Sequence, residues 1–175
     1  NAEIKVVVSI KPIHSLASYL MEGINKPDLI VDGYSSPHGF ALKPSHAKML
    51  QEADIIFYVG EGLENFLEKP LKSIAKKAEK IELMEIQGLQ KLKFRERNVF
   101  DDHDDHGHDE DGHKEDDHDD HGHDEDGHEG HAHGEYDPHI WLDPENAKVI
   151  LNEMVVHLIE NDEKNASIYK SNLNK

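Results

Sequence analysis

Histidine is the residue type that dominates the chemistry available to this chain. Ten of the fifteen histidines fall between residues 103 and 133, and the string DDHDDHGHDEDGH occupies residues 101–113 and recurs unchanged at 116–128. Neutral imidazole is a good ligand for zinc, copper and nickel, while neighbouring carboxylates attract the cation and can orient the rings. The alternative is a solvated acidic linker whose histidines bind nothing. The repetition favours several loose metal sites formed by His103, His106, His108, His113, His118, His121, His123, His128, His131 and His133.

The same segment carries nearly all of the net charge of −18. Residues 101–135 hold 17 Asp and Glu against one lysine, Lys114, so the rest of the chain has a net charge near −2. Apolar residues are almost missing from this segment, so burial cannot offset its ordering entropy. We therefore expect residues 101–135 to form a disordered His/Asp-rich metal-binding loop. No basic cluster is visible elsewhere, which argues against a nucleic-acid partner.

Five histidines lie outside the loop. His14 and His46 fall in the first turns of expected helices, where a partly exposed structural role is favoured. His157 falls inside a helix and is interpreted as a surface or flanking residue. His38 and His139 each stand beside a proline, near the end of an expected element, where the backbone constrains the side chain. Because they flank a segment that attracts metal, we predict that His38 and His139 are metal ligands.

Apolar patterning predicts the elements that position these residues. β-Branched and apolar runs indicate buried strands, and helical spacing follows each of them. This alternation predicts an α/β fold with a parallel βαβ sheet flanked by helices, in which ligands bind at the carboxyl ends of the strands. His38 follows the second strand and so lies where that rule places a site. The expected strands are 3–10, 28–31, 54–59 and 80–84, and the expected helices are 13–21, 44–53 and a third ending near residue 77.

The region after the loop is predicted to be helical. Asp143 is a good N-cap and Pro144 a good first helical residue. The helix that they open has an apolar stripe, a break is expected at residues 161–162, and a second helix starts near Ala166 and is expected to be still running at Lys175. A chain that stops within a helix is expected to be part of a longer protein. The stripe comprises Ile150, Met154, Val155 and Leu158.

Several chemistries have no support in the sequence. Cysteine is absent, which excludes disulfides and thiolate metal sites. There is no H-E-x-x-H, no G-x-S-x-G and no phosphate-binding glycine loop, so we do not expect an enzyme. No run of eighteen apolar residues is present, so no membrane span is expected.

Two motifs resemble a known family. SPHGFALKPS at residues 36–45 and DPHIWLDP at 137–144 resemble the two ligand motifs in the first lobe of the zinc and manganese substrate-binding proteins of ABC importers. VVVSIKPI at 6–13 and ADIIFYVGEGLE at 53–64 are similar to that family's first strand and to the stretch before its third helix. The resemblance covers residues 4–100 and 135–175, and the order of the motifs makes it specific.

The resemblance implies one lobe of a two-lobed α/β metal-binding protein. It assigns residues 1–100 and 136–165 to the N-terminal lobe, and residues 166–175 to the start of a lobe-joining helix. His38 and His139 carry over as first-lobe ligands, whereas the family's third histidine and a carboxylate come from a second lobe that this sequence does not contain. Some zinc relatives have Glu before the first ligand; Pro37 stands there in this sequence.

The implied function is capture of Zn²⁺ in the periplasm and delivery to an inner-membrane ABC permease, by a monomer whose leader has been removed. Manganese is the less favoured substrate, because it prefers oxygen-rich octahedral sites. The alternatives are a metal buffer or chaperone in which the loop does all the binding, a truncated remnant without function, and, more weakly, a zinc hydrolase. Protonation of the histidines below about pH 6.5 is expected to weaken binding.

Overall fold

The computed structural model describes residues 3–94 and 135–175. The predicted loop, residues 101–135, lies outside the described residues except for Glu135, and so do its ten histidines. The described ranges contain no helix with the length and hydropathy needed to cross a membrane.

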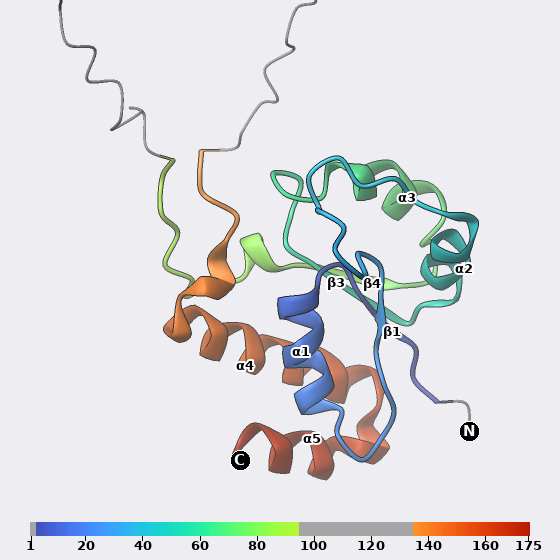
Figure 1. The fold of residues 1–175 in the computed structure, drawn as a ribbon. Helices are drawn as coiled ribbons and strands as arrows, with labels where there is room; N and C mark the ends of the chain where they lie inside the picture. Colours follow the sequence, from blue (N-terminus) through green and yellow to red (C-terminus); the bar gives the residue numbers. More distant parts are fainter. Residues whose placement is uncertain (1–2, 95–134) are drawn as a thin grey trace, which may run out of the picture.

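A four-stranded parallel sheet forms the centre of the fold (Figure 1). Its strand order is β2-β1-β3-β4, and β1 and β3 are buried, as expected for strands covered on both faces. Val7 pairs with Asp28 on one side and with Ile56 on the other. The predicted α/β class with a parallel sheet is therefore confirmed. The strands are β1 Val6–Val8, β2 Asp28–Leu29, β3 Ile55–Tyr58 and β4 Glu79–Glu82.

Helices cover both faces of the sheet (Figure 1). Along the sheet, β2 lies on one side of β1, and the chain then crosses to the other side to form β3 and β4. Because such crossovers are right-handed, the first helix lies on one face of the sheet and the next two lie on the other. The two helices that follow residue 135 pack against each other and against the first. The helices are α1 Lys11–Leu20, α2 Pro44–Glu52, α3 Glu68–Ser73, α4 Pro144–Asn161 and α5 Ala166–Leu173.

The third and fifth helices are shorter than predicted. Instead of one helix to residue 77, a 3-10 turn, η1 Asn65–Leu67, precedes α3, which ends at Ser73. Glu79 must pair with Ile55 in the sheet, so the chain has to leave the helix several residues earlier to become extended. The last helix ends at Leu173 rather than running on to the final residue.

The predicted start of α4 is confirmed. The Asp143 carboxylate accepts a hydrogen bond of 2.8 Å from the Glu145 backbone N–H, and Pro144 occupies the first turn. The four residues of the predicted apolar stripe are all buried. The break also occurs where expected, because Asp162 ends α4 and its carboxylate accepts a hydrogen bond from the Tyr169 hydroxyl of α5. The first contact caps the start of α4, and the second ties its end to α5.

Candidate metal centre

The two histidines predicted to bind metal lie side by side, although 101 positions separate them in the sequence. The ring centroids of His38 and His139 are 6.0 Å apart, and both rings line a cavity of about 290 Å³. Ile10, which follows β1, and Val31, which follows β2, line the same cavity. The pair therefore lies at the carboxyl ends of the strands, where a parallel sheet is expected to bind ligands.

A carboxylate orients the His139 ring. The Asp137 Oδ1 atom lies 2.6 Å from His139 Nδ1 and 2.9 Å from the His139 backbone nitrogen. Asp137 is itself held by its backbone N–H, which donates to the Leu92 carbonyl at 2.7 Å. Trp141 also packs against the imidazole, with ring centroids 5.3 Å apart. The ring is therefore constrained by Asp137 and Trp141 and, through Asp137, by Leu92, which precedes residues 95–134.

The electrostatics of this contact favour one ring nitrogen for metal. The hydrogen bond from the His139 backbone N–H is the largest effect on Asp137 and lowers its pKa; burial opposes it, and the His139 side chain adds to the lowering. An ionised Asp137 keeps the ring proton on Nδ1 and leaves the Nε2 lone pair of His139 available. Carboxylates commonly fix metal-binding histidines in this way. Sequence reasoning assigned no role to Asp137, although it lies in the DPHIWLDP motif.

His38 is exposed and is placed by the loop between β2 and α2. Its backbone N–H donates to Ser36 Oγ at 3.2 Å, and Gly39 follows it with a φ of 79°, a conformation that favours glycine. Phe40 then packs on Phe66, with ring centroids 5.1 Å apart, which attaches the loop to the segment after β3. The loop is therefore tied down directly after the predicted ligand.

A buried glutamate joins the ends of two strands, one of which leads into the cavity wall. Glu64 accepts hydrogen bonds from the backbone N–H groups of Val59 at 3.0 Å and Gly60 at 2.8 Å, and from the Ser9 hydroxyl. Burial raises the pKa of Glu64 despite these bonds. This carboxyl group therefore ties Ser9, just after β1, to Val59 and Gly60, just after β3. Ser9 directly precedes Ile10 of the cavity wall. Sequence reasoning gave Glu64 no role.

The remaining lining of the cavity is mostly apolar. Lys11 is the one lysine, arginine or acidic residue in the described part of the lining. Its ammonium group donates to the Gly33 carbonyl and lies 5.9 Å from the centroid of the Tyr34 ring. No carboxylate lines the cavity among the residues that the structure describes. Stable zinc sites have three or four protein ligands, so His38 and His139 supply part of such a site.

The other three histidines divide into two kinds. His14 Nε2 lies 2.8 Å from the Pro27 carbonyl, and His46 Nδ1 accepts the Lys43 backbone N–H at 3.1 Å, so both have the structural role expected of them. His46 is buried, however, rather than partly exposed. The interpretation of His157 as a plain surface or flanking residue was wrong, because its side chain is only 17% exposed and contacts carboxylates through both ring nitrogens.

The two ends of the undescribed segment meet beside the histidine pair. Lys93 and Tyr136 form an antiparallel bridge, and the Lys93 ammonium lies 2.9 Å from a Glu135 carboxylate oxygen. Tyr136 is followed directly by Asp137. The ten-histidine insert is thus attached next to His139, although its own residues lie outside the described ranges.

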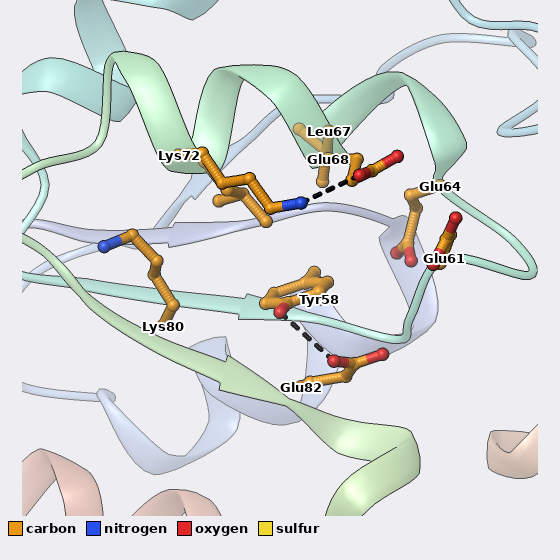
Figure 2. Close-up of a pocket in the computed structure, with 9 residues that line it drawn as sticks. Tyr58, Glu61, Glu64, Leu67, Glu68, Lys72, Lys80 and Glu82 are labelled. Atoms are coloured by element: carbon orange, nitrogen blue, oxygen red, sulfur yellow. Dashed lines mark hydrogen bonds and ion pairs between the residues drawn. The ribbon is translucent and has the colours of Figure 1, made fainter.

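A larger cavity, of about 350 Å³, lies between α3 and the β3–β4 edge (Figure 2). Its charged groups are partly paired with one another: Lys72 contacts Glu68 at 2.8 Å, and the Tyr58 hydroxyl donates to Glu82 at 3.4 Å. Burial, followed by the charge of Glu82, raises the pKa of Tyr58 to about 12. None of the described residues that line this cavity is a histidine, so they do not share the chemistry of the predicted ligands.

Comparison with known families agrees with the motifs and the fold. The family model for the periplasmic zinc-uptake complex component A, ZnuA, matches residues 6–175. The chain belongs to the ZnuA family. It is 46% identical over 174 residues to the high-affinity zinc uptake system protein ZnuA of Brucella abortus (strain 2308), and 32% identical over 174 residues to that of Yersinia pestis. These alignments cover 95% and 99% of this chain and 52% of each relative, so the chain spans about half the length of the curated relatives it matches.

Solved structures share the fold. A Mn-bound periplasmic metal binding protein from Candidatus Liberibacter asiaticus superimposes with a TM-score of 0.68 at 20% identity, over 97% of this chain and 50% of that one. The Zn(II)-bound ZnuA-like domain of Streptococcus pneumoniae AdcA superimposes with a TM-score of 0.66 at 17% identity, over 99% of this chain and 50% of that one. One of these two structures carries manganese and the other zinc.

Proposed function

We propose that this chain binds Zn²⁺ through His38 and His139 for import by a zinc uptake system. The observation that carries the proposal is the meeting of these two imidazoles at the carboxyl end of the sheet, with the Asp137 carboxylate behind His139. The lone pairs of two converging imidazoles can coordinate a divalent cation without covalent chemistry. In the full uptake system, the periplasmic protein would pass the ion to an ABC permease.

The donor atoms support zinc over manganese. Zinc accepts imidazole nitrogen readily in tetrahedral sites, whereas manganese favours carboxylate, carbonyl and water oxygens. The cavity presents two imidazoles and, among its described lining residues, no carboxylate. The two ZnuA relatives named above are zinc uptake proteins, which supports the same assignment. The remaining coordination positions would be filled by further ligands or by water.

A metal buffer is the second candidate, and the ten histidines of residues 103–133 favour it. In that case the insert would do all the binding, and the cavity pair would contribute nothing. Because the insert is attached at Lys93 and Tyr136, directly before Asp137, it could also supply zinc to the pair. The two functions differ in which histidines make the tightest site.

A competition titration with a zinc chelator separates the candidates. We compare the full chain, the double variant His38→Ala/His139→Ala, and a matched double variant, His103→Ala/His106→Ala, that removes two histidines from the insert. Loss of an outer-shell partner alone weakens metal binding 10–100-fold. We therefore expect loss of both ligands to weaken the tightest site by at least about 100-fold and the matched variant to leave it nearly unchanged. Equal losses in the two variants would reject the cavity as the primary site and favour the buffer.

A further inference from the structure

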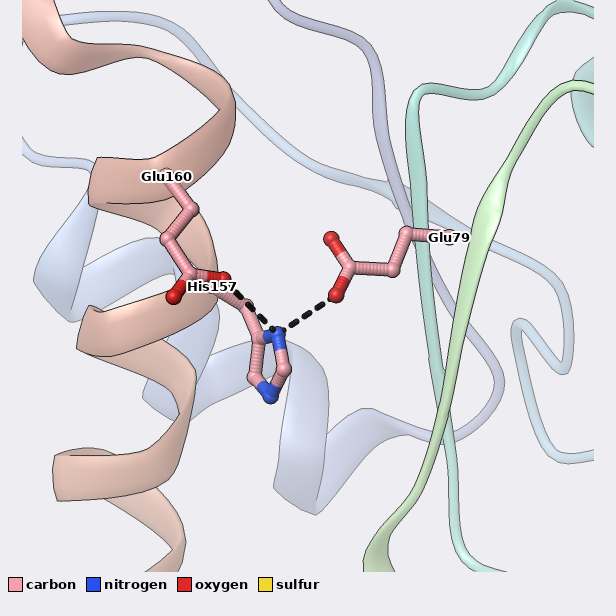
Figure 3. Close-up of side chains that lie close together, drawn as sticks. All are labelled: Glu79, His157 and Glu160. Carbon is pink, nitrogen blue, oxygen red and sulfur yellow. Dashed lines mark hydrogen bonds and ion pairs between the residues drawn. The ribbon is translucent and has the colours of Figure 1, made fainter.

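A second cluster of metal-ligating side chains lies at the opposite end of the sheet. Glu79 is the first residue of β4, and His157 and Glu160 lie near the end of α4 (Figure 3). His157 Nδ1 is 2.7 Å from Glu79 Oε1 and 3.8 Å from Glu160 Oε2. One ligand atom from each of the three residues can be chosen so that all lie within 4.8 Å of one another.

Both nitrogens of the His157 ring face a carboxylate. Nδ1 faces Glu79, and Nε2 lies 3.1 Å from Glu153 Oε1, one helical turn earlier on α4. A neutral imidazole carries one N–H and can donate to only one of these groups. The ring can therefore satisfy both ionised carboxylates only as a doubly donating imidazolium, or with a cation in place of the proton on Nδ1. A proton and a metal ion would therefore compete for the same atom, His157 Nδ1.

The surrounding groups hold the ligands in place. The Asn161 amide donates to Glu79 Oε2 at 2.6 Å, which leaves Glu79 Oε1 turned toward the imidazole. The side chains of His157 and Glu79 are 17% and 34% exposed, whereas that of Glu160 is 61% exposed. In residues 3–94 and 135–175, no lysine or arginine forms an ion pair with Glu79, Glu153 or Glu160.

We propose that His157, Glu79 and Glu160 form a second site for a divalent transition-metal ion, with Zn²⁺ as the probe. His157 Nδ1 and one oxygen from each glutamate would be the ligands, and water would complete the coordination. Glu153 would accept the Nε2–H and fix the tautomer, as outer-shell carboxylates do at zinc sites. A bound ion would tie the edge strand β4 to α4. From Pro144 to His157 along α4 is about 20 Å, so this site is separate from the cavity pair.

Site-resolved NMR can test the proposal in the full chain, despite the many other histidines. Nitrogen-15 spectra of the histidine rings are recorded during a Zn²⁺ titration, and the His157 signals are assigned by their loss in His157→Gln. We expect His157 Nδ1 to change from a protonated to a metal-bound nitrogen, while Nε2 stays protonated. If His157 keeps both ring protons when Zn²⁺ is in excess over all the histidines, the cluster is a salt-bridged imidazolium and the proposal is wrong.

Two glutamate variants and a control identify the ligands. Glu79→Gln and Glu160→Gln keep the side-chain volume but remove a charged ligand, so each should raise the Zn²⁺ concentration needed for the His157 change at least tenfold. Glu163→Gln, at an exposed position just after α4, removes the same charge away from the ring and should have little effect. Signals of His14 and His46, which bond to the backbone, report whether each variant is folded. Equal shifts in all three variants would mean that general charge, rather than coordination, attracts the ion.

Discussion

Imidazole groups lie at both ends of the sheet, in contrasting surroundings. His38 and His139 form a pair at one end, and His157 contacts glutamates at the other. At the carboxyl end, two imidazoles share a mostly apolar cavity, and a single carboxylate, Asp137, stands behind one of them. At the amino end of β4, one imidazole stands among three carboxylates. The first arrangement leaves lone pairs of nitrogen facing a cavity, and the second surrounds nitrogen with negative oxygen.

The difference shows that the groups around an imidazole ring, more than the histidine itself, decide which metal ion a site can bind. An imidazole pair with few oxygens favours zinc or copper, whereas one imidazole with several carboxylates also suits harder ions. The two sites also differ in position. The histidine pair lies at the carboxyl ends of the strands, where loops form ligand sites, whereas the His157 cluster joins a strand directly to a helix. The first region is suited to exchange of an ion and the second to a fixed tie.

The largest expected effect comes from removing the buried carboxyl group that joins the ends of β1 and β3 on the cavity side of the sheet. Glu64→Ala leaves the Ser9 hydroxyl and the N–H groups of Val59 and Gly60 without their buried acceptor. Each unsatisfied buried group costs about 1–3 kcal/mol, so we expect a loss of at least about 3 kcal/mol in the free energy of unfolding, measured by urea denaturation. Glu64→Gln keeps an acceptor for two of the three donors and should lose less. A loss below about 1 kcal/mol in the alanine variant would show that the carboxyl group is not a support.

The next effect distinguishes the two histidine regions directly. Asp137→Asn removes the charge that holds the proton on His139 Nδ1, so zinc affinity at the cavity should fall about 10–100-fold. The His157 ring signals should respond to Zn²⁺ as in the parent chain, because Asp137 does not contact that cluster. Asp32→Asn removes an equal charge from the exposed loop after β2 and is the matched control. The same loss of affinity in the control would mean that Asp137 acts by long-range charge alone.

The smallest effect tests the amino end of the sheet. Asp54 accepts the Lys5 backbone N–H at 2.8 Å and contacts the Lys77 ammonium at 2.6 Å. Burial opposes ionisation of this group, but the hydrogen bonds from Lys77 and Lys5, with their charges, outweigh it and lower the pKa of Asp54. A lowered pKa stabilises the fold above the pKa of an unfolded aspartate, about 3.9, and this contribution is lost as the pH falls through the lower folded value.

Asp54→Asn should therefore reduce the free energy of unfolding by roughly 1 kcal/mol at pH 7. The difference from the parent chain should shrink as the pH is lowered from 5 toward 3, and the zinc affinity of the cavity pair should be unchanged. Denaturation series at several pH values measure the first, and the chelator titration measures the second. A difference that does not vary with pH would show that the ionised carboxylate is not the stabilising species.

The sequence predicted the order of strands and helices, but not every element boundary and not the contacts between distant segments. The alternation of apolar runs predicted the parallel sheet, and the motifs around His38 and His139 singled out two histidines that the fold brings together. That they bind metal stays a prediction. The end of α3 could not be predicted from local pattern, because pairing of Glu79 with Ile55 sets it. His157 was misjudged for the same reason: its partner Glu79 is 78 positions away, and helical spacing shows only Glu153 and Glu160. Asp137 was detectable in principle, since an acid two residues before a histidine can reach its ring.

The most direct test of the central proposal is the nitrogen-15 spectrum of the histidine rings in the full chain at one equivalent of Zn²⁺. We predict that His38 and His139 change together, before the other histidines, and that His139 keeps the proton on Nδ1 and binds metal through Nε2. If both rings are unchanged at one equivalent while signals from the insert shift, the cavity pair is not the primary zinc site.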